Sequence, residues 1–283
     1  MRVRSLCYLI AIILLLSACG EKTSTLEQIK KEGEVTIGVA NEVPYGFKTP
    51  DGEVKGEAPE VIKLVMKRMG VDRVNAVVTE FGSLIPGLKA GRFDIIAAGL
   101  YITPKRCKQV AFTEPTYSIG EGFLVKRGNP KDLHSYEDVK KKDNVKLGAV
   151  AATVELGYAR KLGIPEEKIV VFPNNISAVA GVKSGRIDAL ATTSITVSKL
   201  AEKEAGVVKA APFTDPIIDG KSVRGYGALA VRKNDTELLN ALNMHIKEVV
   251  GSDIHQEAVG KYGFTSENLP GNITAEQLCK PGK

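Results

Sequence analysis

Tryptophan is absent from this 283-residue sequence, and histidine is scarce, with three residues. Aromatic cages for quaternary ammonium ligands are usually built with tryptophan, so its absence disfavours such a cage. His134, His245 and His255 show no metal-binding spacing with one another or with the cysteines. We expect these histidines on surface helices or at their edges, and we expect neither a metal nor a cofactor.

The chain also lacks a basic cluster and any low-complexity tract. Its formal net charge is +6, but lysine and arginine are spread along the sequence, and Lys140–Lys142 is the only run of basic residues. Nucleic-acid-binding domains gather such residues on one face, so we expect no nucleic-acid partner. With 43% hydrophobic residues, a chain of this length can form two globular domains.

Residues 1–19 contain the one long hydrophobic run, and we do not assign them to the fold. Two arginines, then an apolar run of about a dozen residues, then small residues are typical of a secretory signal, and the run is short for a membrane span. The segment Leu16–Cys19 resembles the bacterial lipobox, in which the cysteine is lipidated. We therefore predict an exported lipoprotein anchored to the membrane through Cys19. The alternative is cleavage after Ala18, with Cys19 a free thiol.

Two cysteines remain after the leader is removed. Cys7 leaves with the signal segment, so the mature domain keeps Cys107 and Cys279. An even pair outside the cytoplasm favours a disulfide. The alternative is two unpaired buried thiols.

One order of elements occurs twice in the mature chain. The hydrophobic patterns predict strand, helix, strand, helix and strand at residues 35–40, 58–70, 75–81, 83–91 and 93–99. The same order returns at residues 145–150, 153–163, 169–173, 176–185 and 186–192. The phrase LIPGLKAGRFDIIAAG in the first set corresponds to AVAGVKSGRIDALATT in the second.

This duplication predicts an α/β protein with two similar lobes. Each lobe would be a mixed, mainly parallel sheet flanked by helices, with a ligand cleft at the carboxyl ends of the strands. Two similar segments would form the crossings between the lobes, residues 120–130 and 225–235. The predicted boundaries are a tether and first segment at 20–33, lobe 1 at 34–118 and 225–283, and lobe 2 at 119–224.

Several phrases resemble a known family over essentially the whole mature chain: FGSLIPGLKAGRFDIIAAG, ITPKR, VAFTEP and YGALAVRK. With the element order and the lipobox, they resemble the solute-binding proteins of bacterial ABC importers, polar amino-acid family. The resemblance implies a type II periplasmic-binding clamshell, which we expect to be a monomer, that delivers a small solute to ABC permease and ATPase subunits. It also implies hinge closure near Thr116–Gly120 and Ser222–Tyr226.

The same resemblance assigns a role to Arg106. An arginine at this position binds the ligand carboxylate in the family, and a planar guanidinium matches a carboxylate well. Gly99, where the preceding strand ends, belongs to the same predicted cluster. The alternative is a structural ion pair between Arg106 and Glu114 or Glu121. Backbone N–H groups of three further residues are implied to assist: Tyr101, Thr153 and Val154.

Two positions depart from the amino-acid binders of the family. Those proteins carry an aspartate for the ligand's α-ammonium, and Thr193 occupies its place here. Loss of that charged partner would cost about 2–5 kcal/mol, so we predict a ligand without a primary α-ammonium. Glu42 lies where an aromatic or small residue is usual, and we predict that it binds a positive charge. Aromatic residues expected around it suit a delocalised cation, namely Tyr45, Phe81 and Tyr101.

A ligand with one carboxylate, one delocalised cation and no primary amine is a compatible solute such as ectoine. The phrases ANEVPYGF, GEAPE and YITPKRC also resemble the ectoine- and hydroxyectoine-binding members of the family. Betaine-type solutes, and polar or basic amino acids, are alternatives. An enzyme resembling cyclohexadienyl dehydratases is a further alternative, with Glu42 as its general acid. The predicted cleft has a single carboxylate and no second acid or base, so we expect a binding protein and not an enzyme.

Overall fold

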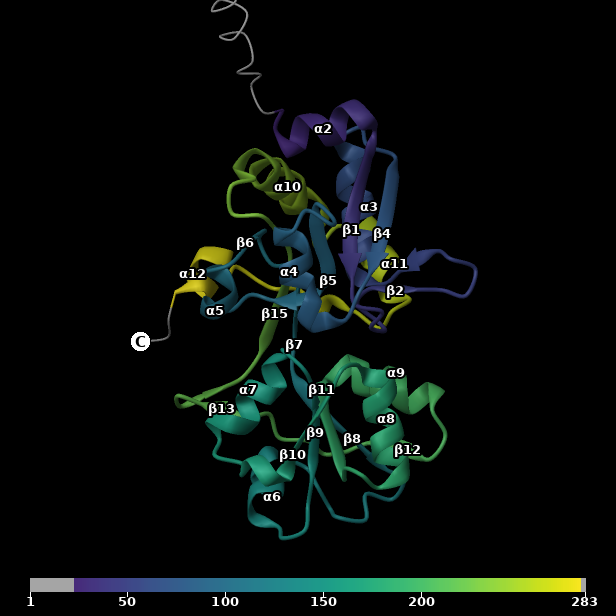
Figure 1. Ribbon diagram of the computed structural model, residues 1–283, viewed down its shortest axis with the longest axis vertical. Helices are drawn as coiled ribbons and strands as arrows, with labels where there is room; N and C mark the ends of the chain where they lie inside the picture. The colour runs from purple at the N-terminus through teal and green to yellow at the C-terminus, as the bar shows by residue number, and fades with distance from the viewer. Residues whose placement is uncertain (1–22, 281–283) are drawn as a thin grey trace, which may run out of the picture.

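The computed structural model describes residues 23–280, and the chain forms two α/β lobes (Figure 1). The first lobe contains the beginning and the end of the described chain, and the second contains the middle. The predicted leader and the lipid site Cys19 lie outside the described residues. Within residues 23–280, no helix is long and apolar enough to cross a membrane.

The first lobe is built on a six-stranded sheet in which β4, β1, β5, β15 and β6 follow one another and β7 pairs with β15. β1 is parallel to β4 and β5, whereas β15 is antiparallel to its neighbours. The strands are β1 (Glu34–Val39), β4 (Arg73–Val78), β5 (Ile95–Tyr101), β6 (Ala111–Phe112), β7 (Tyr117–Ile119) and β15 (Gly225–Val231).

Helices from both ends of the chain cover this sheet. Val61, Ile62, Val65 and Met66 make one face of α3 fully apolar and buried, as expected for a helix packed on a sheet. The late helices α10 and α11 pack against α3. The helical elements of this lobe are α2 (Thr25–Glu32), α3 (Glu57–Arg68), η2 (Phe81–Ser83), α4 (Leu84–Lys89), α5 (Pro104–Cys107), α10 (Thr236–Val249), α11 (Asp253–Gly260), η4 (Ser266–Asn268) and α12 (Ala275–Cys279).

The second lobe repeats this plan around a five-stranded sheet with the order β10, β9, β11, β8 and β12. β9 is parallel to β10 and β11, and β8 is antiparallel to β11 and β12. Its strands are β8 (Glu121–Lys126), β9 (Leu147–Val150), β10 (Ile169–Phe172), β11 (Ala189–Thr193) and β12 (Val207–Lys209). Its helical elements are α6 (Tyr136–Lys141), α7 (Val154–Lys161), η3 (Glu166–Lys168), α8 (Asn175–Ser184) and α9 (Ser194–Lys203).

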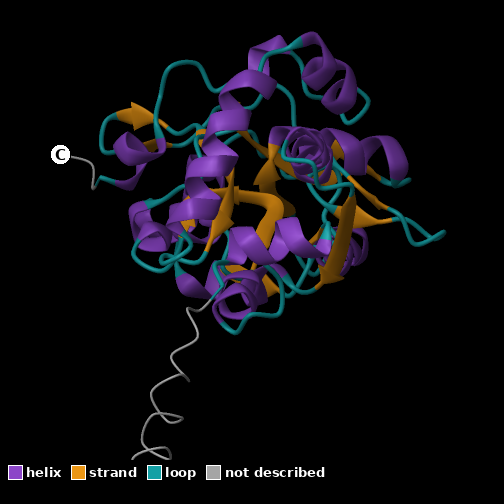
Figure 2. Ribbon diagram, turned by 90° about the horizontal axis from the view of Figure 1, so that it is seen from above, coloured by secondary structure: helices purple, strands orange, loops and turns teal. Residues whose placement is uncertain are grey.

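The apolar strands are buried on both faces, which explains their unbroken hydrophobic runs. In β5, Ile95 and Ala97 belong to one core cluster, whereas Ile96, Ala98 and Leu100 belong to the cluster on the opposite face. Seen from above, the strands lie at the centre with helices around them (Figure 2). Both lobes are therefore layered α/β units, as the duplication predicted, and together they have the clamshell architecture that the resemblance implied.

The two crossings between the lobes are hydrogen-bonded to each other. β7 in one sheet is followed, after Gly120, by β8 in the other. The return strand β15 pairs with β7, with Gly225 opposite Ile119 and Gly227 opposite Tyr117. Two small hairpins complete the structure, β2 (Phe47–Lys48) with β3 (Val54–Lys55), and β13 (Ile217–Ile218) with β14 (Lys221–Ser222).

Candidate ligand-binding site

A small cavity lies between the two lobes, at the ends of their central strands. All nine residues that the sequence predicted as ligand contacts line it: Glu42, Tyr45, Phe81, Gly99, Tyr101, Arg106, Thr153, Val154 and Thr193. Five further residues complete the lining: Val150, Glu155, Asn175, Ala191 and Thr192.

Aromatic rings form one wall of the cavity. Tyr45 and Tyr101 are buried, with 2% and 4% of their surface exposed. Gly99 makes room for Tyr45, because a Cβ at this position would lie 2.5 Å from Cγ of that ring, and its φ of +67° also favours glycine. Gly99 and Tyr101 lie within β5, which continues two residues beyond the predicted strand end. Phe81 lies in η2, after the end of β4.

Arg106 supplies the cation of the cavity. It lies on the short helix α5, where Thr103 is the N-cap and accepts a hydrogen bond from the Arg106 N–H at 3.3 Å. Its guanidinium donates to the carbonyl oxygens of Tyr101 and Ala152, each at 2.9 Å, and its Cζ lies 5.4 Å from the centre of the Phe81 ring. Burial lowers the pKa of Arg106, while the neighbouring Glu155 acts in the opposite direction.

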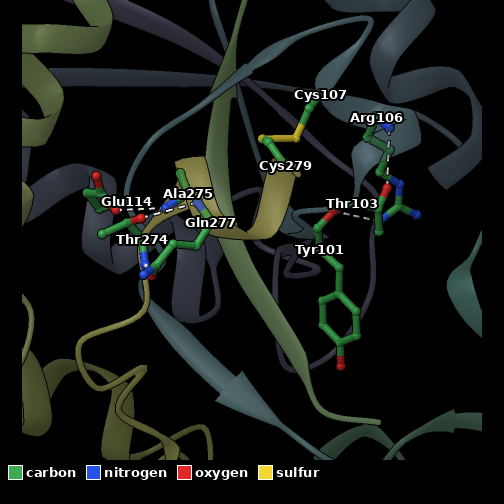
Figure 3. Close-up of a disulfide and its surroundings, with 9 residues drawn as sticks. All are labelled: Tyr101, Thr103, Arg106, Cys107, Glu114, Thr274, Ala275, Gln277 and Cys279. Carbon is green, nitrogen blue, oxygen red and sulfur yellow. Dashed lines mark hydrogen bonds between the residues drawn. A yellow bond between two sulfur atoms is a disulfide. The ribbon is translucent and has the colours of Figure 1, made fainter. Parts of the chain in front are cut away.

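A disulfide fixes the helix that carries Arg106. Cys107 on α5 is bonded to Cys279 on α12, which ties α5 to the end of the chain (Figure 3). The Glu114 carboxylate accepts a hydrogen bond from the Ala275 N–H at 2.9 Å, and Glu114 forms no ion pair with Arg106 in the described structure. The guanidinium is thus held by backbone carbonyls, which cannot neutralise it.

Glu42 supplies a carboxyl group on the loop after β1. The loop is closed by hydrogen bonds between the main chains of Glu42 and Gly46. Asn175 of the second lobe donates to Oε1 of Glu42 at 3.1 Å. Burial raises the pKa of Glu42 to about 7, with a further rise from Glu155 and a smaller opposing effect of the Asn175 hydrogen bond.

The second lobe contributes two helix starts. Thr153 is the N-cap of α7, but its hydroxyl donates to the carbonyl of Val150, so no side chain caps this helix. Thr193 ends β11 and caps α9, where its Oγ1 accepts from the Thr196 N–H at 3.3 Å. Thr193 is therefore a neutral group at the position where the family's amino-acid binders carry an aspartate.

Hydrogen bonds between four pairs of residues join the lobes around the cavity, which makes this a closed arrangement. Two were given above, from Arg106 to Ala152 and from Asn175 to Glu42. In addition, Tyr45 donates to Thr193 at 2.8 Å, and Asn174 donates to Glu80 at 3.2 Å.

Among the further cavity residues, two that the sequence did not predict carry polar side chains that matter for binding, Glu155 and Asn175. Glu155 is 4% exposed and directly follows Val154, a predicted contact. The predicted helix start at residue 153 was therefore the signal that could have indicated it. Asn175 comes just after the predicted strand 169–173, where strand ends meet the cleft. The expectation of a single carboxylate was wrong, because Glu42 and Glu155 both line the cavity.

The histidines also differ in part from expectation. His255 on α11 is 3% exposed, and burial lowers its pKa. A polar helix face has the same sequence pattern whether it contacts water or another segment of the lobe. The sequence around His255 therefore gives no sign of its burial. Among residues 23–280, no group of three or more His, Cys, Asp or Glu side chains has a metal-binding arrangement.

Comparison with known proteins agrees with this geometry. Residues 35–265 match the family described as bacterial extracellular solute-binding proteins, family 3. A probable amino-acid ABC transporter periplasmic-binding protein of Sinorhizobium fredii is 40% identical over 273 residues, which cover 95% of this chain and 90% of that protein.

Two solved structures are also similar. EhuB in complex with hydroxyectoine superposes with a TM-score of 0.81 at 33% identity, covering 91% of this chain and 98% of EhuB. An ancestral amino acid-binding protein, AncCDT-1, described as a precursor of cyclohexadienyl dehydratase, gives a TM-score of 0.73 at 32% identity, covering 84% of this chain and 99% of its own.

Proposed function

The chain belongs to the bacterial extracellular solute-binding proteins, family 3, and from this premise we propose that it is the receptor for ectoine or hydroxyectoine. It is a solute-binding protein of the ABC amino-acid importer class, and it acts outside the cytoplasm with a membrane permease. The finer statement concerns the ligand, which we infer to be a small zwitterion with a delocalised cation.

The observation that carries this proposal is the placement of Arg106 and Glu42 in one aromatic cavity. The guanidinium is the partner for a ligand carboxylate, and the buried carboxyl is the partner for a cation. Tyr45 and Tyr101 line the cavity, and aromatic rings attract cations that lose water easily. The amidinium ring and single carboxylate of ectoine match these three features.

The similarity to EhuB supports the same ligand class. Its structure was solved with hydroxyectoine, and it covers 91% of this chain. Thr192 and Thr193 line the cavity with neutral hydroxyl groups, which suit either ectoine or hydroxyectoine.

A polar or basic amino acid is the second candidate. Glu155 is a buried carboxyl in the cavity and is one that an α-ammonium group can use in place of the missing aspartate. The similarity to an amino-acid transporter protein and to AncCDT-1 supports this candidate.

We also propose how the receptor is held and used. Cys19 would carry the lipid that holds a monomer at the membrane, and each acyl CH₂ contributes about 0.8 kcal/mol to that binding. Closure near Thr116–Gly120 and Ser222–Tyr226 would then present the loaded clamshell to the ABC permease and its ATPase.

Isothermal titration tests the ligand. The purified protein would be titrated with ectoine, hydroxyectoine, glycine betaine, arginine and glutamine, and the ligand recovered afterwards. We expect saturable binding of ectoine or hydroxyectoine and recovery of the unchanged compound.

The outcomes separate the candidates. Binding of arginine or glutamine without ectoine would favour the second candidate. A chemically altered ligand would favour an enzyme.

A further inference from the structure

Two buried carboxyl groups lie near each other and near Arg106. Glu155, in the first turn of α7, lines the cavity, and Glu121, the first residue of β8, is 3% exposed. The two carboxyls are close enough to repel each other when both are ionised. Both oxygens of Glu121 are buried and have no hydrogen-bond partner among the described residues, so ionising both carboxyls at once is unfavourable and one of them holds a proton.

No group of the described chain satisfies the Glu121 carboxyl. Both of its carboxyl oxygens are buried, and no N–H or O–H donor from residues 23–280 reaches either one. The nearby Asp215 is occupied, since its Oδ1 accepts the Glu121 N–H at 2.8 Å. Glu121 is therefore buried without a donor that could stabilise its charge, which favours its neutral form.

Among residues 23–280, the charged groups that face this pair include a single cation. Arg106 approaches from α5, Glu42 from the loop after β1, and Asp215 from the segment after β12. The other titratable neighbours are four tyrosines, which are neutral at physiological pH: Tyr45, Tyr101, Tyr136 and Tyr158. Burial and mutual repulsion raise the pKa of Glu121, and burial raises that of Glu155.

Charge balance then limits what the cavity accepts. Without ligand, the single negative charge of the pair is balanced by Arg106. A zwitterion gives its carboxylate to Arg106 and its cation to Glu42. Glu155 would then be an ionised group in a buried site with no counter-charge, which is unfavourable.

We propose that Glu155 is a specificity-determining residue that couples the binding of a zwitterion to the uptake of one proton. The proton comes from solvent and adds to the Glu155 carboxylate, so that the Glu121–Glu155 pair is neutral beside the bound carboxylate. A ligand with one additional positive charge, such as arginine, is bound without this proton. The inference rests on the proposed function, because it assumes that Arg106 holds a carboxylate.

The coupling predicts opposite effects of pH from the two cavity carboxyls. Glu42 has to lose its proton to bind a cation, so affinity rises with pH until about 7. Glu155 has to gain one, so affinity falls as pH rises further, by up to tenfold per unit. Ectoine affinity therefore passes through a maximum near neutral pH.

The experiment is titration of the full-length protein with ectoine and with arginine from pH 6 to 9, in buffers of different ionisation enthalpy. The dependence of heat on buffer counts the protons exchanged. We expect uptake of about one proton per ectoine at pH 8–9 in the parent protein. Glu155→Gln should take up none and lose the falling limb, because its amide donates to the ligand carboxylate at every pH.

Three further variants test whether the proton uptake depends on Glu155. Glu167→Gln, an exposed acid on the same lobe, should behave as the parent does. Glu42→Gln should lose the rising limb and keep the falling one. If Glu155→Gln does not fold, Glu121→Gln gives the test, since its amide stabilises ionised Glu155 and should move the uptake to lower pH.

Two results would overturn the proposal: no proton uptake by the parent at pH 8–9, or the same uptake in Glu155→Gln. Failure of the ligand assignment is distinguishable. If arginine binds and ectoine does not, the proposed function is wrong, but Glu155 is still tested. The role of Glu155 would be supported if the parent binds arginine without proton exchange and Glu155→Gln binds arginine at least tenfold more weakly. An unchanged arginine affinity in Glu155→Gln would exclude that role.

Discussion

The hydroxyl of Tyr45 in the first lobe donates a hydrogen bond to Oγ1 of Thr193 in the second lobe at 2.8 Å. Both side chains line the cavity, and both are at most 5% exposed. This bond joins the aromatic wall of the first lobe to the start of α9 in the second. It can therefore form only when the lobes are closed.

Tyr45→Phe should therefore weaken ligand binding while leaving the ring in place. A buried neutral hydrogen bond contributes roughly 0.5–1.5 kcal/mol, which corresponds to about two- to tenfold in affinity. Titration of the parent and the variant measures the difference. Tyr262→Phe is the matched control, because that hydroxyl bonds Glu60 away from the cavity. Equal affinities of parent and Tyr45→Phe would show that the bond does not contribute to closure.

Arg106→Ala should abolish measurable binding of carboxylate ligands. Truncating one partner of a buried charge pair costs about 2–5 kcal/mol or more, which is roughly 30-fold or greater. Calorimetry gives the affinity, and Arg92→Ala, an exposed arginine of the same lobe, is the control. If Arg106→Ala keeps the affinity of the parent, another residue binds the ligand carboxylate.

Glu57 should make stability depend on pH. Its Oε1 accepts the Thr116 hydroxyl at 2.8 Å, its Oε2 has no partner among the described residues, and burial raises its pKa to about 8. Between pH 4.5 and 8, the unfolded chain loses this proton and the folded chain keeps it, so stability falls as pH rises.

Glu57→Gln should reduce the fall in Tm between pH 5 and pH 8 by several degrees, since about 1 kcal/mol shifts Tm by roughly 2–4 °C at this size. Thermal denaturation of parent and variant at both pH values is the measurement. The remaining fall includes the contribution of Glu42, which acts in the same direction up to about pH 7. An identical fall in both proteins would mean that Glu57 titrates normally.

Removal of the disulfide should lower both stability and affinity. The bond joins residues 172 positions apart, and loss of a native disulfide typically costs about 2–5 kcal/mol. The double variant of Cys107→Ser and Cys279→Ser should melt at lower temperature and bind ligand more weakly, because Arg106 is adjacent to the bond. Reduction of the parent should reproduce both effects and should leave the double variant unchanged.

The sequence predicted the fold because the repeated strand and helix patterns are long and mostly apolar. It also predicted residues at strand ends, since the carboxyl ends of parallel strands converge on the cleft. It did not predict Glu155 or Asn175. An acid in the first turn of a helix normally faces solvent and stabilises the helix dipole, and only the folded arrangement around the cavity buries Glu155. The burial of His255 was hidden for the same reason, because neighbouring segments cover it only in the folded lobe.

The pairing of β7 with β15 has a mechanical consequence. Two separate linkers could bend independently and let the lobes twist or slide, but these two form one antiparallel ribbon, with Gly225 opposite Ile119 and Gly227 opposite Tyr117. A further link between the two segments is the 2.9 Å hydrogen bond that Arg224, just before β15, donates to Oγ of Ser118 in β7. Because the two strands are hydrogen-bonded to each other, they bend together, so every solute that closes the lobes deforms the same paired segment.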